Sequence, residues 1–177
     1  MIRRLWLLAI AAMMLPSITF AASPYVGEQL RSIKALSDQE VGDYLIGKGM
    51  GFAKAAELNG YPGPAHVLEL ADELALSPLQ KASTEQVFER MQSSARTLGA
   101  RLIDEERQLD ELFASKAISR ESLAKALSSI AAIQGEIRQT HLRAHLEEAQ
   151  ILSEAQAAKY WHLRGYADNI SVPKHKH

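Results

Sequence analysis

The sequence has 177 residues, of which 47% are hydrophobic and 6% aromatic. It contains no cysteine, which excludes disulfide scaffolds, thiolate metal sites and cysteine nucleophiles. The 20 basic and 21 acidic side chains nearly cancel, so composition gives no electrostatic case for nucleic-acid binding. Length and composition suit one soluble domain of ordinary size and leave its function open.

The first residues have the layout of a secretory signal. Arg3 and Arg4 precede an apolar run over residues 5–15, and Pro16 and several small residues follow it. The run is too short to span a bilayer comfortably. We expect cleavage after Ala21, so that residues 1–21 form a signal peptide and the mature protein works in the bacterial periplasm. The alternative is an uncleaved anchor.

Residues 22–64 form a Gly/Pro-rich segment, which holds seven of the ten glycines. We expect it to be irregular, with two short helices. One begins after Ser37, with Glu40 in the reciprocal capping position, and the other covers residues 52–58. The glycine cluster at residues 47–51 follows no predicted strand and lacks the Gly-Lys-Ser/Thr ending of a phosphate loop. We interpret this cluster as a flexible joint.

Residues 65–167 are rich in Ala, Leu, Glu, Gln, Arg and Lys and predict helices without strands. Two apolar stripes recur at alternating steps of three and four residues, which is typical of long helices. The first stripe is Phe88, Met91, Ala95, Leu98, Leu102, Glu105, Leu109 and Leu112, and the second is Leu123, Leu127, Ile130, Gln134, Ile137, His141 and Ala144.

The break between the two stripes, residues 114–119, is short enough to predict an antiparallel hairpin. The predicted fold class is therefore all-α: a long antiparallel α-hairpin flanked by two shorter helices and preceded by the irregular Gly-rich segment. Residues 168–177 are expected to form a flexible C-terminal tail.

Two helix starts in this part of the chain share the pattern L-S-x-x-Q. In each of them the serine is expected at the N-cap and the glutamine three residues later, so that hydroxyl and amide satisfy free backbone N–H groups reciprocally. The leucine before each serine can pack on the following turn. The two motifs consist of Leu76, Ser77 and Gln80, and of Leu152, Ser153 and Gln156.

The paired motifs, the signal sequence, the hairpin between the motifs and a short last helix ending at residues 163–166 resemble the Spy/CpxP (LTxxQ) family of periplasmic proteins. The resemblance covers about residues 65–166. It implies a four-helix, cradle-shaped homodimer that acts without ATP as a chaperone or envelope-stress adaptor for unfolded or stress-exposed proteins. Related members sense or buffer zinc, nickel or cobalt. A membrane sensor kinase is a further partner that we consider.

A cradle of this kind would hold clients through charged rims and apolar spots. The candidate client contacts are Phe88, Met91, Arg90, Arg96, Arg101, Arg107, Arg138 and Arg143. The alternative interpretation makes the arginines a solvated helix face and places Phe88 and Met91 in the core.

A second function, metal sensing or buffering, depends on histidines. His141 and His145 are four residues apart, so both imidazoles can project from one helix face. The hairpin sets them opposite residues 89–94, which brings Glu89 within reach, and His66 can approach from the start of the helical region. Three imidazoles and a carboxylate suit Zn, Ni or Co. The alternative is an interior His141 in the apolar stripe and an exposed His145.

We expect no enzyme activity. The sequence has no Gly-x-Ser-x-Gly elbow, and its acidic pairs fall on helix faces, where they serve as solvated charge or ion pairs. No cofactor is expected to be required beyond an optional divalent metal, and no nucleic-acid partner is expected.

Overall fold

The computed structural model describes residues 23–166, and within them the protein is all-α and has no strand. The helices are η1 (Glu28–Leu30), α1 (Asp38–Leu45), α2 (Lys54–Glu57), α3 (Pro64–Glu69), α4 (Pro78–Ala114), α5 (Arg120–Ile151) and α6 (Glu154–Leu163). None of these helices is long and apolar enough to cross a membrane. The expected signal peptide, residues 1–21, and the expected tail, residues 168–177, lie outside the described residues.

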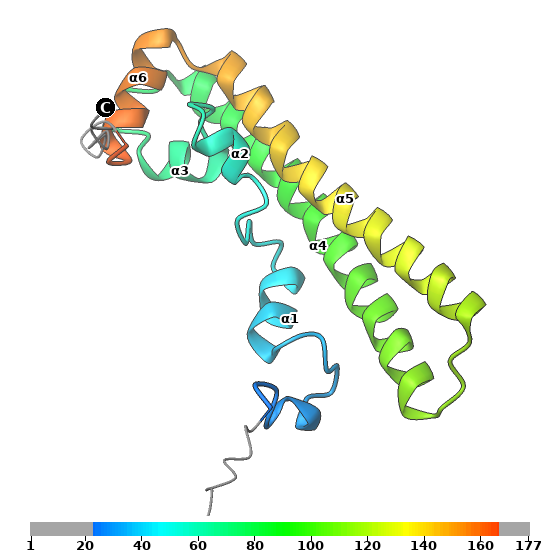
Figure 1. Ribbon diagram of the computed structural model, residues 1–177. Coiled ribbons are helices and arrows are strands. Elements are labelled where there is room, and N and C mark those ends of the chain that lie inside the picture. Colours follow the sequence, from blue (N-terminus) through cyan, green and yellow to red (C-terminus); the bar gives the residue numbers. More distant parts are fainter. Residues whose placement is uncertain (1–22, 167–177) are drawn as a thin grey trace, which may run out of the picture.

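The long helices α4 and α5 lie side by side and antiparallel, as Figure 1 shows, which confirms the predicted hairpin. With 37 residues, α4 extends roughly 55 Å at 1.5 Å per residue. It starts at a capping box formed by Ser77 and Gln80, with Pro78 in the first turn. A second box, formed by Ser119 and Ser122, starts α5 after the chain has reversed.

The interior of the hairpin differs in part from the predicted stripes. Leu102, Ile130 and Ile137 form its core as expected, but the fourth core residue is Ile133, with 2% of its surface exposed. The predicted stripe residue Leu127 is instead 50% exposed, and Gln134 is also exposed. At about 3.6 residues per turn, Leu127 and Gln134 lie at one edge of the buried face of α5 and Ile133 lies at the other, so this face is centred between them, near Ile130 and Ile137.

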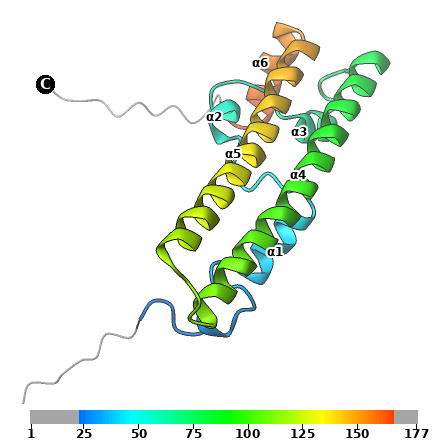
Figure 2. The same cartoon turned by 90° about the vertical axis from the view of Figure 1, so that its right-hand side faces the viewer.

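The segment before the hairpin packs along it. Helices α1 and α3 contact α4, and α2 contacts α5, in agreement with Figures 1 and 2. Ile33 and Leu36 form a small core with Ile103 of α4, and Tyr44 and Phe52 pack against the core of the hairpin. The expected capping box of Ser37 and Glu40 is present at the start of α1. The Gly/Pro-rich segment therefore covers part of the hairpin instead of extending away from it.

One end of the hairpin is closed by α3 and α6 around a separate core. Val67, Leu74, Leu152 and Tyr160 are buried there, and Leu76 packs against them. Both motif leucines thus contribute to the same core.

The two L-S-x-x-Q motifs meet directly at this closed end. Gln80 Nε2 donates to Gln156 Oε1 at 2.8 Å, and Gln156 Nε2 donates to Gln80 Oε1 at 3.1 Å. Each amide also donates to a backbone carbonyl, Gln80 to Ile151 and Gln156 to Leu74. We call this arrangement the glutamine pair. It joins two caps that are 76 residues apart in the sequence.

Substitutions at two glycines inside the long helices test the packing of α1 on the hairpin. A Cβ atom added at Gly99 would lie 2.4 Å from the Tyr44 carbonyl oxygen, whereas one added at Gly135 would meet nothing within 4 Å. We expect Gly99→Ala to lower the free energy of unfolding by about 1–3 kcal/mol through overpacking. Gly135→Ala, the control, should raise it by about 0.5–1 kcal/mol through helix propensity. Urea unfolding of both variants measures the difference, and equal stabilisation by both would mean that α1 does not lie on α4.

Candidate functional site

A cavity of about 590 Å³ lies between the Gly-rich loop and the hairpin. We call it the histidine cavity. Its walls come from loop residues 46–51, 53 and 63, and from α2, α3, α4 and α5. The side chains from these helices include His66, Phe88, Met91, Gln92, His141 and His145. The predicted imidazoles and the predicted apolar client contacts therefore share one space.

The loop over the cavity depends on unusual backbone conformations. Gly47 and Gly51 have φ angles of +69° and +82°, in the left-handed region that favours glycine. A Cβ atom at Gly47 would also lie 2.9 Å from the Gln92 carbonyl oxygen. The glycine cluster that we interpreted as a flexible joint is thus a cavity wall that closely approaches α4.

His141 lies deep in the wall of the cavity, with 3% of its surface exposed. Its ring stacks on Phe52, with the ring centroids 5.9 Å apart and the planes at 8°. Burial, followed by the proximity of His145, lowers the pKa of His141, so the imidazole is neutral at pH 7. Its Nε2 has no hydrogen-bond partner among the described residues. Such a buried polar atom costs about 1–3 kcal/mol until a partner reaches it.

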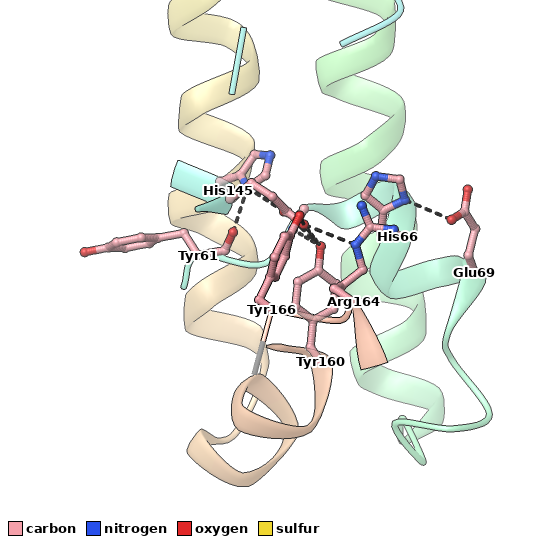
Figure 3. A network of polar contacts seen from close by, with 9 residues as sticks. Tyr61, His66, Glu69, His145, Tyr160, Arg164 and Tyr166 are labelled. Carbon is pink, nitrogen blue, oxygen red and sulfur yellow. Dashed lines mark hydrogen bonds and ion pairs between the residues drawn. The ribbon is translucent and has the colours of Figure 1, made fainter. Parts of the chain in front are cut away.

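His145 is held by the backbone. Its Nδ1 donates to the Tyr61 carbonyl oxygen at 2.8 Å, as drawn in Figure 3, and lies 3.8 Å from Glu57 Oε2. Only glycine fits at position 63, because a Cβ atom there would be 2.8 Å from His145 Cε1. The ring orientation of His145 is therefore fixed by neighbours that the sequence places about 80 residues away.

A polar cluster around Glu57 lies beside the cavity, and we call it the Glu57 cluster. Tyr160 donates its hydroxyl to Glu57 at 2.8 Å, Tyr166 at 3.0 Å and the Arg164 Nε–H at 3.2 Å. Burial raises the pKa of Tyr160 well above its usual range, so the phenol stays a donor. The cluster joins α2 to α6 and the residues just after it, and Figure 3 shows Tyr160, Arg164 and Tyr166 converging.

A further buried carboxyl group, Glu148, lies between the hairpin helices. It is fully buried, and Thr84 donates its hydroxyl to Glu148 Oε1 at 2.9 Å. Glu148 Oε2 has no hydrogen-bond partner among the described residues. Burial raises the pKa of Glu148 to about 7, and the hydrogen bond from Thr84 only partly offsets this effect. With His141 and His145, Glu148 follows the spacing of one face of α5.

The predicted metal ligands are brought together only in part. His66, His141 and His145 line the histidine cavity, but Glu89 is exposed and is not among the residues that line it. His66 turns toward Glu69, 2.9 Å away (Figure 3). In residues 23–166 no three His, Asp or Glu side chains are grouped closely enough to hold an ion. The alternative of an interior His141 fits its burial, whereas the alternative of an exposed His145 is wrong, because its exposed fraction is 8%.

The predicted client contacts fall into three places, one of which is a hollow of about 190 Å³ between α4 and α5 that is lined by Arg90, Met91 and Arg143. Phe88 and Met91 are half-buried in the cavity wall. Arg138 and Arg143 instead line a shallow groove of about 320 Å³ on the outer face of α5, together with Leu142 and Leu146. We call it the α5 groove.

The other predicted arginines all have partners. Arg90 pairs with Glu147 at 2.8 Å, and Arg101 with Glu136 at 3.6 Å. Arg96 donates its Nε–H to the carbonyl oxygen of Ile46 at 3.3 Å, and Arg107 pairs with Asp104 on its own helix. The ion pairs of Arg90 and Arg101 link α4 to α5 across exposed surface, where such pairs contribute little to stability.

Sequence reasoning missed Glu57 and Glu148. Glu57 lies in a short helix and gains its role only from partners about 100 residues later. Glu148 follows His141 and His145 at helical spacing, and that spacing was a usable signal for a polar face on α5.

Comparisons with known proteins identify no relative of this chain. No protein-family model matches the chain, and neither a curated protein nor a solved structure does. The functional interpretation therefore depends on the residues and contacts described above.

The buried Glu148 predicts a pH dependence of stability. The folded-state pKa of Glu148, about 7, lies above the ordinary value of 4.5. Its stabilising contribution to the free energy of unfolding is therefore complete below pH 4.5 and is lost as pH rises through 7. His141, with a lowered pKa, acts in the opposite direction as pH falls. Between pH 5 and pH 8 the wild type should lose about 2–3 kcal/mol relative to Glu148→Gln, measured by urea unfolding.

The neighbouring substitution Glu147→Gln is the control, because that carboxylate is partly exposed and paired with Arg90. It should keep the pH dependence of the wild type. Parallel profiles for the wild type and Glu148→Gln would show that Glu148 is not protonated in the folded protein.

Proposed function

We propose that this chain is a periplasmic, ATP-independent chaperone or envelope-stress adaptor of the Spy/CpxP type, which holds unfolded or stress-exposed proteins on the outer face of α5. The observation that carries the proposal is the α5 groove. Leu146 is 52% exposed there, and Arg138 and Arg143 line the groove with it. Exposed apolar side chains rimmed by charge are typical of a surface that binds other proteins weakly and reversibly.

The shape of the hairpin supports this proposal. An antiparallel pair of helices about 55 Å long cannot cover both of its faces with the short elements present in residues 23–166. Those elements pack on α4 and on the part of α5 that α2 and α3 reach, and Leu127 and Leu146 of α5 stay exposed. Such a surface can contact an extended client over several helical turns.

The contact between the two L-S-x-x-Q motifs is a second line of support. The glutamine pair explains why the motifs occur twice with the same spacing, since each amide needs the other. Both motifs belong to the set of features by which the sequence resembles the Spy/CpxP family, and the signal-like residues at the start of the sequence favour the periplasm.

Client binding can be tested with the mature chain and reduced α-lactalbumin as an aggregating, acidic client. We expect suppression of light scattering at near-stoichiometric amounts without ATP or metal. The double variant Arg138→Gln, Arg143→Gln should need roughly threefold to tenfold more protein for the same suppression, because it removes both charges from the groove.

The control for this experiment is Lys81→Gln, Arg120→Gln, which removes the same charge at two exposed positions outside the groove. It should behave like the wild type. Absence of suppression by the wild type would contradict the proposed function, and equal losses in both double variants would assign binding to net charge instead of the groove.

The second candidate is a sensor or buffer of Zn, Ni or Co, favoured by the presence of His66, His141 and His145 around one cavity. It requires these side chains to rearrange, since they form no ligand group in the described conformation. Calorimetric titration of tag-free protein with Zn²⁺, Ni²⁺ or Co²⁺ tests it. Stoichiometric binding that is lost in His141→Ala, His145→Ala but kept in the exposed control His162→Ala would favour this candidate, and no binding would exclude it.

A further inference from the structure

The histidine cavity is a space for a small molecule. Its volume of about 590 Å³ falls within the range of roughly 300–1,000 Å³ that small-molecule sites occupy. Apolar side chains such as Ile46, Pro64, Phe88 and Met91 form much of its wall. It lies under the Gly-rich loop, whereas the α5 groove is lined by other residues of α5. The two therefore call for different ligands.

The polar groups at the cavity determine which charge it accepts. Its two carboxylates are already occupied: Glu57 by Tyr160, Tyr166 and Arg164, and Glu69 by His66. A cationic ligand in the inner part of the cavity would have to displace the donors of Glu57, whereas Glu69, with 67% of its side chain exposed, lies at the surface.

The donors that a ligand can still use are different groups. His141 Nε2 is buried and has no partner among residues 23–166, and Lys54 is exposed where α2 begins at the cavity wall. Lys48 also lines the cavity, but it is paired with Asp43 at 3.0 Å. The ammonium group favours an anionic oxygen, and the neutral imidazole donates to the same oxygen in the tautomer that carries its proton on Nε2.

We propose that the histidine cavity binds a small amphipathic organic acid, with its flat apolar body against Phe88 and Met91 and its anionic group near Lys54 and His141. The stacked rings of Phe52 and His141 stiffen the inner wall, so the space is already formed in the free protein. The site is independent of client binding on the α5 groove, and either can exist without the other.

Two fluorescent dyes test this inference directly. 1-Anilinonaphthalene-8-sulfonate has an aromatic body and one anionic group, and N-phenyl-1-naphthylamine is its neutral counterpart. We expect the folded mature protein to bind the anionic dye saturably, at one dye per chain, with a blue shift of its emission. The neutral dye should bind more weakly.

Substitutions distinguish the contribution of the Lys54 charge to dye binding from the contribution of the cavity volume. Lys54→Gln should weaken binding of the anionic dye roughly threefold to tenfold and change binding of the neutral dye by less than about twofold. Lys125→Gln, an exposed lysine on α5 that does not line the cavity, is the matched control and should change neither. Met91→Trp, which fills the cavity, should weaken both dyes about tenfold or more.

The inference fails if neither dye binds saturably, or if Lys54→Gln leaves the preference for the anionic dye unchanged. It also fails if Leu146→Ala, in the α5 groove, removes the signal, because the dye would then report the exposed surface. Since Lys54 is exposed, its variant is expected to fold and to give a clear result even where Met91→Trp is unstable.

Discussion

The reciprocal hydrogen bonds of Gln80 and Gln156 tie the start of α6 to the start of α4 at the closed end of the hairpin. Each amide completes a helix cap and also reaches a carbonyl of another segment, so neither can move without leaving polar groups unpaired. The pair fixes how α6 returns onto the start of α4. It thereby sets the register in which Thr84 meets Glu148 and in which α6 delivers Tyr160 to Glu57.

The Gly-rich segment turns a simple hairpin into a protein with two different surfaces. Tyr44 and Phe52 pack on the hairpin core, and the ion pair of Lys34 with Asp110 holds the segment to α4. Its loop lies over His141 and His145 and forms one wall of the histidine cavity, whereas the outer face of α5 stays open. The same pair of helices thus carries an open groove on one face and a separate cavity under the Gly-rich loop.

The sequence was sufficient for the features that depend on local chemistry. Helical periodicity predicted the hairpin, and serine with glutamine or glutamate three residues later predicted the starts of α1, α4 and α6. The sequence was insufficient where contacts between distant segments determine the position and burial of a side chain. The predicted ligand Glu89 is exposed. The carboxylate that lies at the cavity is instead Glu57, which is held there because α6 reaches α2. The burial of Glu148 likewise depends on the pairing of two helices, which periodicity alone does not fix.

We propose that an unfolded client lies on the outer face of α5 while the Gly-rich loop keeps its place. Hydrogen–deuterium exchange of the mature chain, with and without reduced α-lactalbumin, tests it most directly. We expect added protection along residues 135–146 of α5 and unchanged exchange in residues 46–54. Protection confined to residues 46–54, or release of α1 and α2 from the hairpin on client binding, would contradict the claim.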